Sequence, residues 1–168
     1  MVPLVDLPLW LRATLNVGGW LAWSAVVGLV GHRRPLASFA VERWWSRARA
    51  VEREGKLYEE RLHIRAWKDR LPEAGAVFAG GFAKRQLLDP DRGLGGRRAV
   101  LERYVVETRR AEWVHWVIPA ATPVFLVWND GWVAPLMVLY AVAANGPCLV
   151  VQRYNRARLQ RVLARQPR

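Results

Sequence analysis

Ionisable side chains crowd into one ten-residue stretch, Glu107–Trp116, which reads ETRRAEWVHW. It holds two acids, two arginines and a histidine, and a long apolar run begins directly after it. Charged groups at the edge of a membrane are costly to place and usually have a function. We therefore look for catalytic or binding side chains in this stretch first.

His115 is the candidate general base of this stretch. A helix would place Glu107, Glu112 and His115 on roughly the same side. A glutamate three residues before a histidine can fix the imidazole tautomer and stabilise its protonated form, as the acid of an acyl-transfer triad does. We predict Glu112, or else Glu107, in that role. The alternative is an interfacial histidine with no role.

The arginines that follow Glu107 have two interpretations. Arg109 and Arg110 either bind phosphate or pair with nearby acids and mark the inner face of a membrane. Position alone does not separate these two interpretations.

The spacing Glu-x-x-His occurs twice, at Glu60 and His63 and at Glu112 and His115. This spacing is found in di-metal helical bundles, which also take a carboxylate from each of two further helices. The spare acids here lie on the same two predicted helices, so we assign no metal and keep a metal site as the minority alternative.

Composition indicates a membrane protein. Half of the 168 residues are apolar and the net charge is +12, yet the apolar residues gather in blocks with the charge between them. The ten tryptophans suit a membrane–water interface. The basic charge then marks a cytoplasmic surface, and we predict no nucleic-acid partner. The single cysteine, Cys148, excludes a disulfide within the chain.

The apolar blocks predict an all-α integral membrane protein with about three transmembrane helices and a cytoplasmic amphipathic helical region. The blocks are Leu9–Val30, Trp113–Trp128, with two prolines that should kink it, and Val133–Val151. Val41–Lys68 reads as one amphipathic helix. We divide the chain into an N-terminal transmembrane helix (1–31), a basic amphipathic region (32–112), a transmembrane hairpin (113–152) and a basic tail (153–168). The positive-inside rule places the middle region and the tail in the cytoplasm.

The predicted hairpin brings a second polar cluster to the depth of the first. Tyr140 and Asn145 lie inside the third apolar block, where a buried amide needs a partner, either another helix or a substrate hydroxyl. The run Gln152–Arg156 ends that block at the cytoplasmic face, level with Glu107–Trp116. We infer a site at the inner leaflet for an amphiphile whose tail stays in lipid.

Several motifs resemble one family. They are WKDxLP at 67–72, ETRRAExxHW at 107–116, NxG at 129–131, YAxxANxP at 140–147 and VQRYNRxRL at 151–159. Together they are similar to the glycosyl-4,4'-diaponeurosporenoate acyltransferase family of small bacterial membrane enzymes. The resemblance implies transfer of a fatty acyl group to the sugar 6-hydroxyl of a glycosylated carotenoid, in the bacterial cell membrane.

This activity suggests roles for the candidate residues. The expected partners are membrane lipid, a glycosylated carotenoid acceptor and an acyl donor. We expect acyl-CoA as co-substrate and no other cofactor, and we assign no oligomeric state. Arg65 and Lys68 would hold the donor's phosphates, and Asn145, Arg109 or Arg153 would donate to an oxyanion. The alternative is a non-enzymatic scaffold or lipid-binding partner of such a pathway. The full set of predicted substrate-binding residues is Arg65, Trp67, Lys68, Asp69, Arg109, Arg110, Tyr140, Asn145, Arg153, Tyr154, Asn155 and Arg156.

Overall fold

The computed structural model describes residues 4–71 and 97–165, and within these ranges every regular element is helical. The all-α prediction is confirmed for this part of the chain. The α-helices are α1 (Leu9–Arg33), α2 (Lys56–Glu60), α3 (Arg97–Val117), α4 (Thr122–Phe125) and α5 (Val133–Arg165). The 3₁₀ helices are η1 (Leu36–Phe39), η2 (Ala50–Gly55), η3 (Ile64–Ala66), η4 (Lys68–Arg70) and η7 (Pro119–Ala121).

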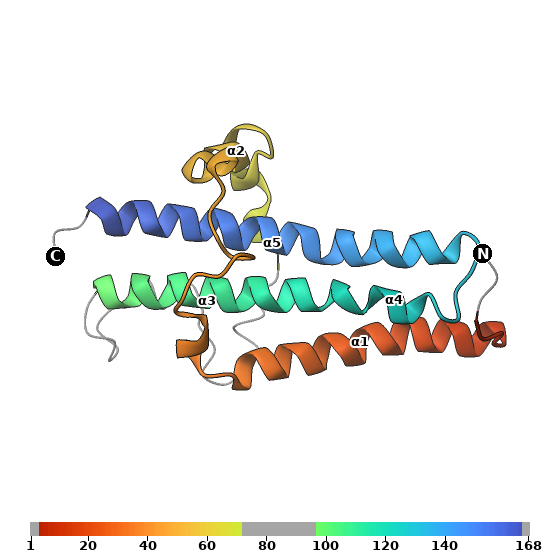
Figure 1. The fold of residues 1–168 in the computed structure, drawn as a ribbon. Coiled ribbons are helices and arrows are strands. Elements are labelled where there is room, and N and C mark those ends of the chain that lie inside the picture. Colours follow the sequence, from red (N-terminus) through yellow and green to blue (C-terminus); the bar gives the residue numbers. More distant parts are fainter. Residues whose placement is uncertain (1–3, 72–96, 166–168) are drawn as a thin grey trace.

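Three long segments lie side by side along the molecule (Figure 1): α1, α3 continued by α4, and α5. The middle segment is antiparallel to both of its neighbours, so the two chain ends lie at opposite ends of the bundle (Figure 1). Residues 34–71 leave the end of α1, cross α3 and pack on α5. This crossing joins all three segments at the level where the predicted polar clusters lie.

Proline sets the limits of two helices. Pro35 follows α1, and Arg34 before it is extended, because proline disfavours helical geometry in the preceding residue. Pro119 and Pro123 interrupt the second apolar block. The sequence predicted a kink in this block, and the structure shows the chain passing there from α3 through η7 into the single turn of α4.

Aromatic contacts pair α1 with the second apolar block. Trp20 stacks on Phe125 with ring centroids 4.2 Å apart. Trp23 donates to the carbonyl of Ile118 at 3.2 Å. Near the other end of α1, a Cβ on Gly31 would lie 2.6 Å from a Val114 methyl, so glycine is what allows the two helices to approach there.

Polar contacts close the end of the bundle nearest the N-terminus. Arg12 of α1 forms an ion pair with Asp130 at 3.1 Å. Asn16 accepts from Trp128 at 2.8 Å and exchanges hydrogen bonds with Asn129. These groups are largely shielded from water, and each has a partner, so they fix the register of α1 against the hairpin.

The prediction of one helix over Val41–Lys68 is wrong. The segment consists of bends, three 3₁₀ turns and the short helix α2, and it contains left-handed residues such as Arg53, Glu54 and His63. Buried arginines from α3 and α5 take backbone carbonyls of residues 40–47. A helix would use those carbonyls for its own hydrogen bonds, so the tertiary contacts replace the helix.

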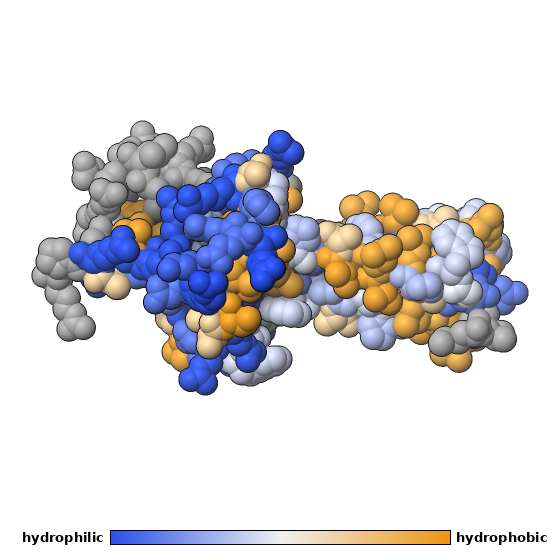
Figure 2. All heavy atoms as spheres, turned by 90° about the horizontal axis from the view of Figure 1, so that it is seen from above, coloured by the Kyte–Doolittle hydropathy of each residue, from blue (hydrophilic) through white to orange (hydrophobic). Residues whose placement is uncertain are grey.

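The bundle has an apolar half and a polar half (Figure 2). Two helices, α1 and α5, are long and apolar enough to cross a membrane by length and composition. The third predicted span, 113–128, is not one continuous helix, because it includes the end of α3, η7 and α4.

The predicted domain boundaries fall inside continuous elements. Residues 112 and 113 are neighbours within α3, and residues 152 and 153 within α5. The predicted hairpin and tail therefore share one helix. Part of the predicted amphipathic region, 72–96, lies outside the described residues.

Candidate functional site

A fully buried carboxylate lies where α3, α5 and the crossing segment meet. Glu112 has no exposed surface and forms ion pairs with Arg153 and Arg156 of α5, both at 2.6 Å. The two arginines are three residues apart and so lie on one face of α5. We call Glu112, Arg153, Arg156 and Glu52 the anchor cluster.

All five N–H donors of the Arg153 guanidinium form hydrogen bonds within the protein. Its Nε and one Nη donate to Glu52, and its other Nη donates to Glu112. The two remaining N–H groups bind the carbonyls of Trp45 at 3.1 Å and Arg47 at 2.7 Å. A guanidinium has five N–H donors, so Arg153 has none left for a substrate or an oxyanion.

The other buried arginines hold the same crossing segment. Arg156 donates to the carbonyl of Ser46 at 2.9 Å, and Arg109 donates to that of Ala40 at 2.6 Å. Arg109 also lies 3.7 Å from Glu42. Arg109 and Arg156 were both predicted to bind substrate, and in the structure both donate hydrogen bonds to backbone carbonyls of the protein.

The carboxylates keep Arg153 charged. Burial alone would lower the pKa of Arg153, but Glu52 and Glu112 outweigh it and raise that pKa above its usual value. The arginine is therefore a permanent cation at this point in the fold.

His115 is oriented by Asn145 across the α3–α5 interface. The side chain of Asn145 is buried, and its amide N–H donates to the carbonyl of Ala141 at 3.0 Å. Its oxygen therefore faces the imidazole and lies 3.1 Å from Nδ1 of His115. An amide oxygen can only accept, so Nδ1–H donates to it, and the neutral ring has its lone pair on Nε2.

This geometry replaces the predicted pairing of Glu112 with His115. Both oxygens of Glu112 face arginines of α5, and the histidine is held by an amide instead. Glu112 and His115 both face α5, but the arginines opposite Glu112 are stronger partners for a carboxylate than a neutral imidazole is.

Glu107 belongs to a separate ion-pair group one turn earlier in α3. It lies 2.5 Å from Arg110 and 3.9 Å from Arg103, and it is 7% exposed. Burial raises the pKa of Glu107 above its usual value, although the charges of these arginines act to lower that pKa. The structure does not bring Glu107 to His115 through any of these contacts.

Tyr154 joins α5 to the predicted phosphate-binding segment. Its buried hydroxyl donates to Glu59 at 3.0 Å and accepts from Arg65 at 3.4 Å. Arg65 also pairs with Glu59 at 2.9 Å. The guanidinium of Arg65 is thus partly neutralised by an acid of its own segment.

The remaining predicted residues are dispersed. Lys68 pairs with Asp69 at 2.6 Å, and Trp67 donates to the carbonyl of Leu62. Tyr140 is 46% exposed on the apolar half, with its ring 5.5 Å from that of Trp20. Asn155 is half-buried on α5.

No metal-ligand set appears in the described ranges: nowhere in residues 4–71 and 97–165 do three or more His, Cys, Asp or Glu side chains come together. In the first Glu-x-x-His pair, Glu60 instead binds Arg53 at 2.7 Å. In the second, Glu112 binds arginines and His115 binds Asn145.

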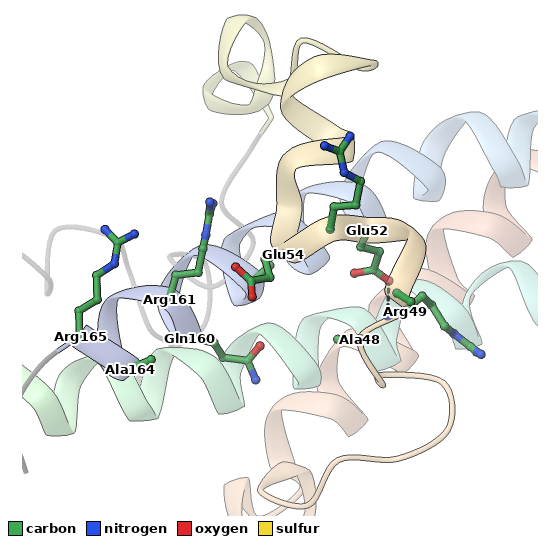
Figure 3. Close-up of a pocket in the computed structure, with 11 residues that line it drawn as sticks. Ala48, Arg49, Glu52, Glu54, Gln160, Arg161, Ala164 and Arg165 are labelled. Carbon is green, nitrogen blue, oxygen red and sulfur yellow. Dashed lines mark hydrogen bonds between the residues drawn. The ribbon is translucent and has the colours of Figure 1, made fainter.

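A cavity of 560 Å³ lies in the polar half, between η2 and the end of α5. Figure 3 shows Arg161 and Arg165 rising from α5 along one side and Glu54 facing them from η2. Four arginines, two glutamates, four alanines and Gln160 line the cavity. Its lining shares Glu52 with the anchor cluster.

Sequence reasoning missed Glu52 and the backbone carbonyls of residues 40–47. Glu52 lies in a charge-rich run with no spacing that singles it out. Every residue has a backbone carbonyl, so the sequence does not indicate which carbonyls accept hydrogen bonds from side chains. Residues 153–165 contain five arginines and no acid, and this imbalance is the one sequence signal that could have indicated acceptors elsewhere in the chain.

Replacing Glu112 with Gln is expected to destabilise the protein by about 3–5 kcal/mol, because it leaves the buried Arg156 without a carboxylate partner and leaves Arg153 with Glu52 alone. Thermal and denaturant unfolding in detergent would measure this. Glu102→Gln is the matched control, since it removes an exposed partner of Arg98 on the same helix and should cost less than about 1 kcal/mol. Equal effects of the two changes would contradict the anchor cluster.

Comparison with known proteins gives the chain relatives by sequence. A family model described as glycosyl-4,4'-diaponeurosporenoate acyltransferase matches residues 42–165. Proteins of that name from Staphylococcus aureus strains bovine RF122 / ET3-1 and USA300 are each 28% identical over 146 residues. The match covers 86% of this chain and 83% of each relative. No solved structure matches.

The matched region contains α3, α5, the anchor cluster, and the His115–Asn145 pair. Because the match extends over more than half of the chain, this protein belongs to the glycosyl-4,4'-diaponeurosporenoate acyltransferase family.

Proposed function

We propose that this protein is a multi-pass enzyme of the bacterial cell membrane that esterifies a fatty acyl group onto the sugar 6-hydroxyl of a glycosylated carotenoid. Membership of the acyltransferase family supports acyl transfer and the class of acceptor. The orientation of His115 by Asn145 is the structural observation that carries the catalytic part of the proposal.

Exposure supports a membrane location for the apolar half. Only 11% of the apolar window of α1 and 17% of that of α5 is buried inside the protein. Large apolar side chains such as Leu21, Leu139 and Val142 are more than half exposed. A core helix of a soluble protein would bury such residues, whereas lipid covers them here.

The spacing of the polar groups supports three spans. Between Val133 and Arg153, α5 rises about 30 Å at about 1.5 Å per residue, which equals one hydrocarbon thickness. The Arg12–Asp130 pair lies at one end of this distance and the anchor cluster at the other. We place residues 9–31 of α1, the segment 113–128 and residues 133–152 of α5 across the bilayer, with residues 32–112 and the tail in the cytoplasm.

His115 is the proposed general base. Its free Nε2 removes the proton of the sugar hydroxyl as the hydroxyl oxygen attacks the acyl carbonyl carbon. The tetrahedral intermediate collapses, the carbon–sulfur bond of the thioester breaks, and the proton passes from Nε2 to the leaving thiolate. Asn145 holds the imidazole throughout, and the anchor cluster positions α3 against α5 without touching the substrate.

The cavity between η2 and α5 is the proposed site for the phosphates of acyl-CoA. Arg65 and Lys68, the residues expected from the sequence, pair closely with Glu59 at 2.9 Å and Asp69 at 2.6 Å. Arg161 and Arg165 line the cavity instead, and Arg161 has only a longer contact of 3.6 Å with Glu59. Ala157 in its wall lies about 18 Å along α5 from Asn145, a distance that the long pantetheine arm is suited to bridge.

A non-enzymatic scaffold was the other function expected from the sequence. Under that interpretation the polar groups are only structural, and this description does fit the anchor cluster. It leaves the oriented imidazole of His115 without a purpose, and the family is one of enzymes.

Membrane topology can be tested by cysteine labelling in a Cys148→Ala background. Trp132→Cys at the hairpin turn and Arg165→Cys near the C-terminus are both at exposed positions. In right-side-out vesicles, a membrane-impermeant maleimide is expected to label the first and not the second, and permeabilisation should reveal the second. Labelling of both from outside would contradict three spans.

Acyl transfer can be tested with purified protein in detergent, labelled acyl-CoA and a glycosylated carotenoid. His115→Gln is expected to lower kcat/KM by about 10²–10⁴ because it removes the base. Asn145→Asp keeps an acceptor for Nδ1–H and should retain more activity than Asn145→Leu, which removes it. Folding of each variant is verified by its unfolding midpoint. Folded variants with wild-type rates would exclude these roles.

A further inference from the structure

A short segment at the membrane boundary turns charged and aromatic side chains outward. We call residues 40–49 the strap. Its carbonyls at Ala40, Trp45, Ser46 and Arg47 accept hydrogen bonds from Arg109, Arg153 and Arg156 inside the bundle. Because those carbonyls face inward, much of the side-chain surface of the strap faces away from the bundle.

The outward face combines an exposed tryptophan with arginines. Trp44 is 80% exposed and Val41 is 70% exposed. Arg43, Arg47 and Arg49 are exposed on the same segment. Within residues 4–71 and 97–165 no acid pairs with the side chain of Arg43 or Arg47, whereas Glu42 is directed to Arg109.

The level of the strap places this face among lipid headgroups. Its backbone is hydrogen-bonded to Arg153 and Arg156, which follow the apolar block 133–151 of α5. Figure 1 shows the chain crossing α3 towards α5 after the end of α1, and Figure 2 shows hydrophilic surface beginning next to the apolar half. Arg34, at the end of α1, lies over the ring of Trp113 4.6 Å away, another interfacial arginine–tryptophan pair.

We propose that the strap is a binding surface for anionic phospholipid headgroups of the cytoplasmic leaflet. Tryptophan favours the interface, where its ring is buried and its N–H stays hydrated. Arginines beside it attract lipid phosphates and the negative surface potential of that leaflet. Because the strap backbone is bonded to the anchor cluster, lipid held by the strap stabilises the packing of α3 on α5. The inference rests on the membrane placement proposed above and does not depend on acyl transfer.

The test compares unfolding midpoints in nanodiscs of phosphatidylcholine alone and with phosphatidylglycerol. The wild type is expected to unfold about 4 °C or more higher with the anionic lipid. Arg43→Gln with Arg47→Gln should remove most of this difference, because the two charges that attract the lipid phosphates are lost. Only side chains change, so the hydrogen bonds to the carbonyls of the strap remain and the fold is kept.

Arg161→Gln with Arg165→Gln is the matched control. It removes the same charge from α5, and the two residues lie about 12 and 18 Å beyond Arg153, both further than a Debye length of about 8 Å. This control should keep the lipid-dependent difference. Equal loss in both double variants would show a general charge effect and overturn the proposal.

Further experiments distinguish stabilisation by lipid from stabilisation by other anions. Inorganic phosphate added to protein in neutral detergent should not reproduce the stabilisation, and if it does, the site binds free anions and the lipid proposal fails. A wild type that enters nanodiscs but unfolds equally in both lipids also overturns it. A wild type that stays soluble without detergent overturns the membrane placement itself.

Discussion

The ion pairs of buried Glu112 with Arg153 and Arg156 hold the polar half of this protein together. They join α3 to α5, and the same arginines bind the crossing segment through its backbone and through Glu52. Buried charges stabilise a fold only when each is paired and its remaining donors are satisfied. The irregular path of residues 40–49 provides those acceptors, which explains why this segment is not a helix.

The anchor cluster also determines where the chemistry can occur. With α3 and α5 fixed at Glu112, the next turn of α3 brings His115 opposite Asn145. In the membrane placement that we propose, the imidazole then lies just inside the apolar half, close to the cytoplasmic surface. A lipid-linked sugar at that depth would meet the base while its tail remained in the bilayer, and a soluble donor would approach from the cytoplasm.

The sequence predicted the helical class, the antiparallel arrangement of the last two segments, an irregularity at Pro119 and Pro123, for which it indicated a kink, and the meeting of the two polar clusters. Those features follow from hydrophobic blocks and helix periodicity, which are local. It did not predict the partner of Glu112, because i,i+3 spacing favoured His115 and the arginines come from the other end of the hairpin. The helix expected over residues 41–68 failed for the same reason, since distant arginines take its carbonyls.

Catalysis by His115 requires that the fold present the ring with Nδ1 protonated and Nε2 free. Nitrogen-15 NMR of the protein in detergent, with the His115 signal assigned by its loss in His115→Gln, reports this tautomer. We expect a neutral ring with its proton on Nδ1, and a change in this signal in Asn145→Leu. A ring with its proton on Nε2, or a His115 signal that does not change in Asn145→Leu, would exclude this arrangement of the ring.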